Sequence, residues 1–287
     1  YTLTPERVLG NALKLGYREW FNHYVGMSHY FRLGWDGARF VVATEGDPLN
    51  APCRVWHADF CARGAALGYK VILSLSYELF DAHAPEDWKQ RAGDGSPALT
   101  GWDPPSTLLS PANDVAMAWL RGVGEAFAGF GAPWFQIGEP WWWTGFGADR
   151  TPCFHDAAAT SAYAAETGLA APPAMADVLE TPSAAQAAYH AWLGGKLGAS
   201  TLALRDAVKA LGTKVALLFY APQVLRPEAA WLAAVNMPAA WAYPAFDVLQ
   251  LEDYDFVTDG NAGARGRRCR RRAATRPRSS TIFRDLC

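Results

Sequence analysis

One stretch of the chain combines a carboxylate, a short strand and three indole rings. Trp134–Ile137 has the apolar pattern of a buried strand, and Glu139 follows it between Gly138 and Pro140. Gly138 permits an unusual backbone turn, and Pro140 stops further strand pairing. A carboxyl group held near apolar side chains has a raised pKa, as a proton donor in sugar cleavage requires. Because flat aromatic faces stack on pyranose rings, Trp141, Trp142 and Trp143 are expected to line a cleft beside this acid.

A structural interpretation of Glu139 stays open beside the catalytic one. Buried charges gather at functional sites, but they also occur in structural ion pairs, and Glu139 could be paired with a neighbouring Arg or Lys in a core strand. Glycoside cleavage needs two carboxyl groups. Glu252, at the end of the strand-like stretch 246–252, is the candidate for the second catalytic group. Glu78, just past the strand-like stretch 70–76, is either a further site residue or a surface residue that begins a loop.

Other polar residues also follow expected strands. In a barrel of parallel strands, the site is built at the carboxyl ends of the strands. We therefore expect further substrate contacts there, although a lone His is more often structural and an Asp in this position more often caps a loop. These candidates are His29, Tyr77, Tyr220 and Asp253.

Helical and strand-like stretches alternate along the chain, which predicts a parallel sheet with crossover helices. The expected strands are 23–31, 39–43, 70–76, 134–139, 214–220 and 246–252. The expected helices include 49–67, 114–130, 157–167, 183–211 and 227–235. No glycine-rich phosphate loop follows any strand, which disfavours a nucleotide-binding sheet. The predicted fold is an α/β (β/α)8 TIM-barrel-like domain, incomplete at one or both ends.

The composition narrows the class of protein. The formal net charge is −2, which gives no general attraction to nucleic acid or to an anionic membrane surface. The five cysteines form no CxxC pair and no zinc-like cluster with His, so free thiols in a reducing compartment are expected. Nothing in the sequence calls for a metal or a cofactor. The chain begins at Tyr1 without a methionine or a signal peptide, which indicates a fragment.

The last segment of the chain lacks the alternation of helical and strand-like stretches. The barrel-like sequence extends over residues 1–260, whereas 261–287 is rich in Arg and has no periodicity. A basic tail for an anionic surface is one interpretation. The favoured interpretation is an out-of-frame translation of a GC-rich gene, which would be disordered.

Two sequence motifs resemble those of retaining glycoside hydrolases built on TIM barrels. Glu139-Pro140 matches the second half of the Asn-Glu-Pro motif that carries the acid/base of that clan, and Gly138 stands where the clan has Asn. In that clan the nucleophile is a Glu at the end of the seventh strand. The match of Glu252 is weaker, since it ends the sixth strand or an earlier one. The resemblance implies a glycosidase-like site that lacks one substrate-holding amide.

A wider resemblance covers nearly all of residues 1–260. This part of the chain resembles the TIM-barrel domain of phage non-contractile tail sheath proteins. Four motifs carry the resemblance: 26–31 (GMSHYF), 74–80 (SLSYELF), 100–107 (TGWDPPST) and 138–143 (GEPWWW). This resemblance implies a tail component of a phage or prophage, made in the bacterial cytoplasm. Its partners would be other tail subunits and cell-surface polysaccharide. An active retaining glycosidase and a barrel that only binds glycan are the alternatives.

Overall fold

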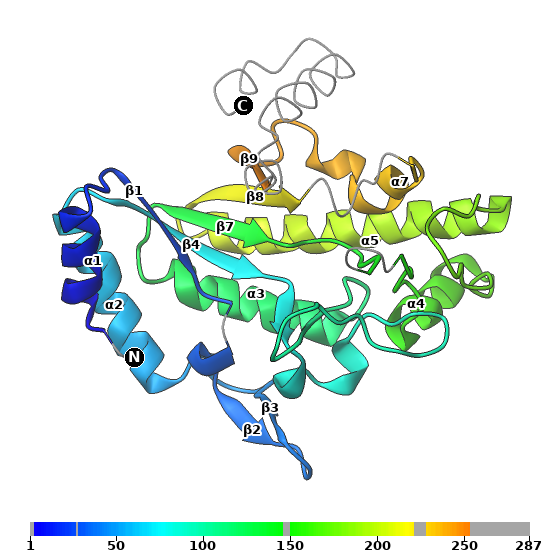
Figure 1. Ribbon diagram of the computed structural model, residues 1–287, viewed down its shortest axis with the longest axis horizontal. Helices are drawn as coiled ribbons and strands as arrows, with labels where there is room; N and C mark the ends of the chain where they lie inside the picture. Colours follow the sequence, from blue (N-terminus) through cyan, green and yellow to red (C-terminus); the bar gives the residue numbers. More distant parts are fainter. Residues whose placement is uncertain (1–2, 27, 146–149, 221–227, 253–287) are drawn as a thin grey trace.

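Five parallel strands form the centre of the molecule (Figure 1). The computed structural model describes residues 3–26, 28–145, 150–220 and 228–252, with the backbone alone for residues 220, 251 and 252. The sheet order follows the chain order, and each strand pairs in parallel with the next. The strands are β1 (Trp20–Tyr24), β4 (Lys70–Ser76), β7 (Trp134–Gly138), β8 (Lys214–Tyr220) and β9 (Val248–Glu252).

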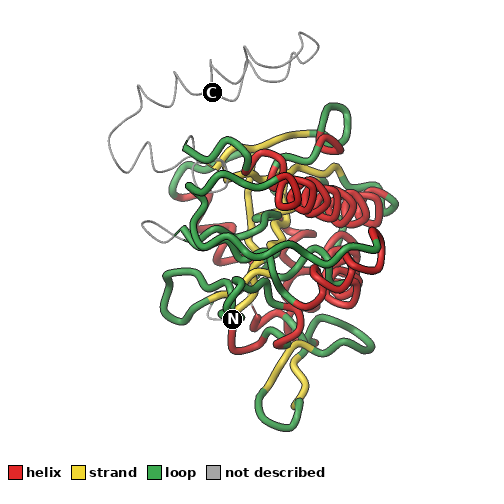
Figure 2. The backbone as a smooth tube through the Cα atoms, turned by 90° about the vertical axis from the view of Figure 1, so that its right-hand side faces the viewer, coloured by secondary structure: helices red, strands yellow, loops and turns green. Residues whose placement is uncertain are grey.

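Helices cover one face of this sheet, as Figure 2 shows. They are α1 (Pro5–Lys14), α2 (Ala51–Ala66), α3 (Asp114–Ala128), α4 (Ala157–Thr167), α5 (Ala184–Lys209) and the short α7 (Leu232–Asn236). The five longer helices begin at residues whose side chains accept a backbone N–H bond from the first turn, which satisfies otherwise orphaned donors. These caps are Thr4, Asn50, Asn113, Asp156 and Ser183.

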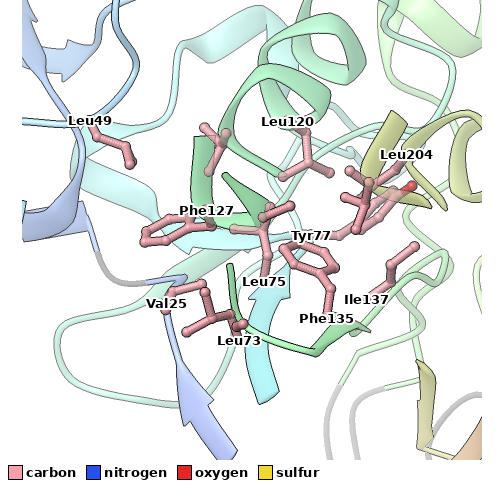
Figure 3. Packing of buried hydrophobic residues seen from close by; sticks show 14 of the residues in the cluster. Val25, Leu49, Leu73, Leu75, Tyr77, Leu120, Phe127, Phe135, Ile137 and Leu204 are labelled. Carbon is pink, nitrogen blue, oxygen red and sulfur yellow. The ribbon is translucent and has the colours of Figure 1, made fainter. Parts of the chain in front are cut away.

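The two faces of the sheet differ because side chains alternate along a strand. Leu73, Leu75, Phe135 and Ile137 are buried on the helical side, where they belong to the main core. Figure 3 shows this packing against α3 and α5, with Leu120, Phe127 and Leu204 in the same cluster. Toward the carboxyl ends of β4 and β7 the intervening residues, Ser74, Ser76, Gln136 and Gly138, face the other way and are polar or small, so this end of the inner face is suited to a site rather than to a second apolar core.

The structure confirms most of the expected elements and corrects three. The helix expected over 227–235 is the shorter α7, which begins at Leu232. The first strand is Trp20–Tyr24, and the expected continuation to residue 31 instead contains the 3-10 helix η1 (Ser28–Tyr30). The stretch 39–43 does contain a strand, β3 (Phe40–Val42), but it pairs with β2 (Leu33–Trp35) in an antiparallel hairpin. This hairpin extends from the body of the molecule and takes no part in the parallel sheet (Figure 1). The segment 261–287 lies outside the described residues.

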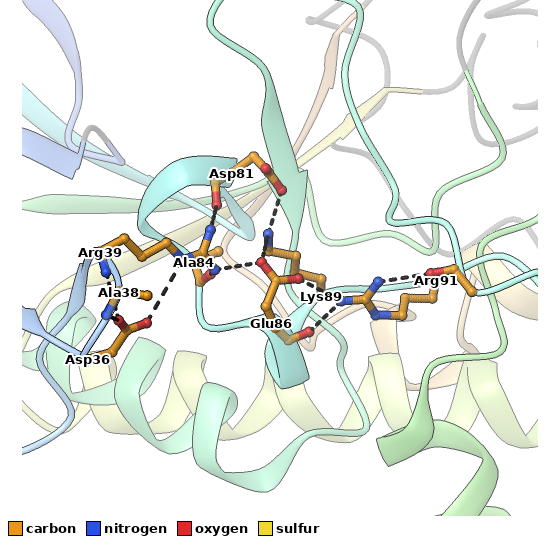
Figure 4. Close-up of polar contacts among 9 residues, drawn as sticks. Asp36, Ala38, Arg39, Asp81, Ala84, Glu86, Lys89 and Arg91 are labelled. Atoms are coloured by element: carbon orange, nitrogen blue, oxygen red, sulfur yellow. Dashed lines mark hydrogen bonds and ion pairs between the residues drawn. The ribbon is translucent and has the colours of Figure 1, made fainter.

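The long connection after β4 has its own structure. It contains β5 (Glu78–Phe80), η2 (Asp81–His83), η3 (Glu86–Trp88) and β6 (Ser106–Leu108), and β5 pairs with β6. An ion cluster fixes its first half (Figure 4). The Lys89 ammonium is only 2% exposed and lies 2.7 Å from Asp81 and 2.8 Å from Glu86. Arg39 of the β2–β3 hairpin also bonds Glu86, at 2.6 Å, so the hairpin and the connection are held together.

We expect Lys89→Met to lower the free energy of unfolding by about 3 kcal/mol, because Asp81 would lose its buried partner. Chemical denaturation measures the change. Lys209→Met is the control, since Lys209 forms a more exposed pair with Asp247, and its loss should cost less than about 1 kcal/mol. Equal losses in the two variants would show that the Lys89 cluster has no special role in stability.

Candidate functional site

The backbone of Glu139 is in an unusual conformation. Its φ is 55°, in the left-handed region that a residue with a side chain seldom adopts. The sequence predicted an unusual turn at Gly138, but Gly138 is not among the positive-φ glycines. The backbone N–H of Tyr77 holds the Gly138 carbonyl at 3.1 Å, and that of Trp141 holds the Glu139 carbonyl at 3.0 Å. Such a conformation costs on the order of 1–3 kcal/mol, and residues of this kind gather at functional sites.

Ser76 connects the ends of β4 and β7. The strand register places Ser76 opposite Gly138, directly before Glu139. The Ser76 hydroxyl donates a short hydrogen bond to Oε2 of Glu139. The same hydroxyl oxygen accepts the backbone N–H of Glu78 at 2.8 Å. One buried hydroxyl group therefore fixes both the Glu139 carboxyl group and the start of the segment that carries Glu78.

Glu78 lies beside Glu139 at the start of β5, because its backbone N–H bonds the same Ser76 hydroxyl that bonds Glu139 Oε2. Burial raises the pKa of Glu78 above its usual value, and hydrogen bonding with Ser106 and Glu139 opposes that rise only in part. The structure therefore brings two of the carboxylates that the sequence singled out to the carboxyl edge of the sheet.

A row of polar side chains lies deeper on the inner face. The Gln136 carbonyl oxygen accepts from Ser74 Oγ at 2.5 Å and from the Asn22 amide at 3.5 Å. The Gln136 amide in turn donates to Gln250. This row spans β1, β4, β7 and β9 and satisfies their buried polar groups. Sequence analysis missed it, because single polar residues in short strands carry no spacing signal.

The tryptophans after Glu139 do not line an open cleft, contrary to the expectation. All three side chains are buried. Trp142 packs between α4, α5 and α7, and its indole N–H donates to the Leu193 carbonyl at 3.1 Å. Trp141 and Trp143 belong to another buried cluster, with Phe219. The rings were expected at the surface because sequence reports an aromatic run without showing which elements enclose it.

Two buried amides hold the main chain of this triplet. Asn236 accepts the Trp142 N–H at 2.8 Å and donates to its carbonyl at 3.1 Å. On the other side, Gln90 donates to the Trp141 carbonyl at 2.9 Å and accepts the Trp143 N–H at 2.8 Å. Each amide thus bonds the backbone as a neighbouring strand would. The triplet is an anchor that fixes the chain immediately after Glu139.

The other predicted site residues are placed as follows. Tyr77 is fully buried on the helical side, where its hydroxyl donates to Ser200 of α5 at 3.0 Å, so it does not face the site. His29 lies in η1 against the ring of Tyr30, and burial lowers its pKa. The backbones of Tyr220 and Glu252 pair with each other at the ends of β8 and β9. The side chains of both residues, and the whole of Asp253, lie outside the described residues.

Trp102 is an exposed aromatic side chain on the loop before β6 that sequence analysis left unassigned. It lies in a loop closed by two hydrogen bonds, from Ser106 N to Thr100 Oγ1 at 3.1 Å and from Thr100 N to the Ser106 carbonyl at 2.9 Å. Its side chain is 61% exposed. Because β6 pairs with β5, the loop that carries Trp102 leads into the strand beside Glu78.

The surface hollows, the acidic, His and Cys side chains and the helices of the described residues indicate no second functional site. Two shallow hollows lie on the helical side, one at α1 and α2 and one at α2, α3 and α5, and neither is lined by Glu78 or Glu139. Over the described part of the chain, no group of three or more His, Cys, Asp or Glu is arranged to hold a metal ion. None of the described helices is both long and apolar enough to span a membrane.

The parallel sheet with outer helices and a polar inner face defines this chain as part of a TIM barrel. More specifically, the chain belongs to the family of the non-contractile tail sheath protein TIM barrel, whose model matches residues 1–278. This confirms both the barrel-like fold and the family resemblance that the sequence indicated.

Two solved enzymes are similar to this chain at a low level. One is an α-galactosidase from Thermus thermophilus, with 15% identity, 75% of this chain and 35% of that chain covered, and a TM-score of 0.40. The other is the α-N-acetylgalactosaminidase NagBb from Bifidobacterium bifidum, with 12% identity, coverages of 88% and 32%, and a TM-score of 0.43. The chain spans about a third of the length of either enzyme. At this level of similarity neither comparison assigns an activity.

The anchoring role of the triplet leads to a stability prediction. Trp142→Ala removes a large side chain that is fully buried between helices. We expect the free energy of unfolding to fall by about 3–5 kcal/mol, as for other buried aromatic truncations. Denaturant titration gives the value, with the 60% exposed Trp35 changed to Ala as the control. If Trp142→Ala cost no more than Trp35→Ala, the triplet would not be an anchor.

Proposed function

We propose that this barrel is the part of a phage tail that acts on cell-surface polysaccharide, with Glu139 as the general acid and base of glycoside cleavage. The observation that carries the proposal is the position of Glu139, which leaves β7 at the carboxyl edge of the sheet in a left-handed conformation with its carboxyl group held by Ser76. A TIM barrel builds its sites at this edge. Membership of the tail sheath family supports a place in the virion tail, in contact with other tail subunits.

In glycosidases the distance between the two catalytic carboxyl groups depends on the mechanism. A retaining glycosidase separates its acid and its nucleophile by about 5–5.5 Å, and an inverting one by about 6.5–9.5 Å. The backbone N–H of Glu78 bonds the Ser76 hydroxyl that also bonds Glu139, so Glu78 begins directly beside the proposed acid rather than across the barrel mouth from it. Glu78 is therefore not our candidate for the nucleophile. Glu252 remains the proposed nucleophile, because its strand ends at the same edge of the sheet.

Glycan binding without cleavage is the second candidate function. It is favoured by Gly138, which has no side chain to hold a sugar hydroxyl in the position directly before Glu139. A Cβ atom added at Gly138 would lie 3.4 Å from the Leu75 carbonyl oxygen, an ordinary contact, so packing does not demand a glycine there. Under this candidate function, Glu139 would contact a sugar hydroxyl and leave the glycosidic bond intact.

Glu139→Gln tests the cleavage. We expect it to lower kcat for the release of reducing ends from host cell-wall or capsular polysaccharide by at least about 100-fold, since the amide cannot transfer the proton. The matched control is Glu125→Gln, an exposed carboxylate on α3, which should keep the parent rate. Unchanged kcat in Glu139→Gln would exclude Glu139 as the acid. Binding by the parent with no release of sugar would support the second candidate function.

Trp102→Ala tests how the glycan is held. If a sugar ring stacks on this exposed indole, the loss of the ring should weaken polysaccharide binding about 10-fold, a contribution of roughly 1.4 kcal/mol. Binding is measured by calorimetry with the same polysaccharides. Trp35→Ala is the matched control, because Trp35 is similarly exposed, at 60%, on the distant hairpin. Equal effects of the two substitutions would argue against a binding role specific to Trp102.

A further inference from the structure

The first strand carries a tyrosine on the inner face of the sheet that sequence analysis did not single out. Tyr24 is the last residue of β1 and pairs in parallel with Ser74 of β4. Two residues earlier on β1, the Asn22 amide donates to Gln136 on the inner face, at 3.5 Å. Because side chains two residues apart on a strand lie on the same face, Tyr24 also faces inward. It therefore lies on the inner face, toward the end of the sheet at which Glu139 leaves β7.

The ring of Tyr24 extends toward the carboxyl end of β1 and covers Gly26. A Cβ atom added at Gly26 would lie 2.5 Å from the Tyr24 hydroxyl oxygen and 2.6 Å from its Cζ. Gly26 is not among the positive-φ glycines, so this glycine serves the close approach of the ring and not an unusual backbone conformation. Gly26 also begins the motif 26–31, and the position of the Tyr24 ring gives that glycine a physical reason.

The Tyr24 side chain is accessible where its neighbours are not. It is 39% exposed, whereas its strand partner Ser74 and the adjacent Gln136 are buried. A tyrosine offers a flat apolar face and a hydroxyl group that both donates and accepts hydrogen bonds, which suits a sugar ring and its hydroxyl groups. Ser76, which holds Glu139, lies one strand across and two residues further along, a step on the order of 8 Å. One saccharide chain can therefore contact both places.

We propose that Tyr24 is a substrate-contact residue whose ring stacks on a pyranose unit of the polysaccharide, and that Gly26 leaves the space which this ring position requires. The inference deepens the proposed function and rests on it for the identity of the ligand. Proton transfer stays with Glu139, so the contribution of Tyr24 is to binding. Its loss raises the dissociation constant and KM and leaves kcat nearly unchanged.

The first test measures polysaccharide binding by calorimetry in the Glu139→Gln background, so that the ligand stays intact. Host cell-wall and capsular polysaccharides are the probes. Tyr24→Ala should weaken binding about 10-fold. Tyr24→Phe keeps the ring and loses one hydrogen bond, so it should weaken binding only about 3-fold. Tyr17→Ala is the control, because Tyr17 is an exposed tyrosine at the amino end of the same strand, and it should bind as the background does.

The second test moves the ring without removing it. Gly26→Ala adds a methyl group where the Tyr24 hydroxyl end lies, so the ring must shift and binding should weaken. In a Tyr24→Ala background the same change should have little further effect, because the ring it displaces is gone. Gly34→Ala is the control, since a Cβ atom there meets nothing within 4 Å.

The outcomes separate this inference from the proposed function. Unchanged binding in Tyr24→Ala, or a loss no larger than that of Tyr17→Ala, would overturn the role of Tyr24 and leave the role of Glu139 intact. If the parent binds polysaccharide but releases no sugar, the proposed cleavage fails, and the dissociation constants of the Tyr24 variants still decide whether the ring contacts the glycan. If neither the parent nor Glu139→Gln binds any of the polysaccharides, both proposals fail.

Discussion

The register of β4 against β7 is the constraint on which the candidate site depends. It places Ser76 opposite Gly138, so the serine hydroxyl lies beside the residue that leaves the sheet. From there the hydroxyl fixes the Glu139 carboxyl group and the backbone of Glu78 at once. A shift of one residue would turn Ser76 toward the helices and bring Leu75 or Tyr77 to the inner face, because side chains alternate along a strand. The pairing of two core strands thus determines the position of the acid group.

The packing around Glu139 offsets the free energy of its strained backbone. Glu139 adopts a left-handed backbone conformation, which other contacts must stabilise. The segment after it is held by two buried amides, from Gln90 and Asn236, and by the insertion of Trp142 between helices. The ion cluster around Lys89 fixes the connection that carries Gln90. Residues far apart in sequence therefore converge on one short turn.

This organisation is consistent with a tail domain that needs a rigid scaffold. The helical side of the sheet forms the main core, and the inner face carries a polar row from Asn22 to Gln250. Family membership places the chain among tail sheath TIM barrels.

The sequence by itself determined the alternation of helices and strands, the helix caps and the family. Apolar periodicity and capping residues such as Asn113 are local signals, so the parallel strands β4, β7, β8 and β9 and most of the helices could be predicted. The sequence also singled out Glu139 and Glu78, because each follows a strand. It could not show that one serine hydroxyl bonds both segments, since that depends on the register of β4 against β7. The burial of Trp142 and the position of Tyr77 on the helical side of the sheet were likewise decided only by the tertiary structure, because both depend on the elements that pack around the residue.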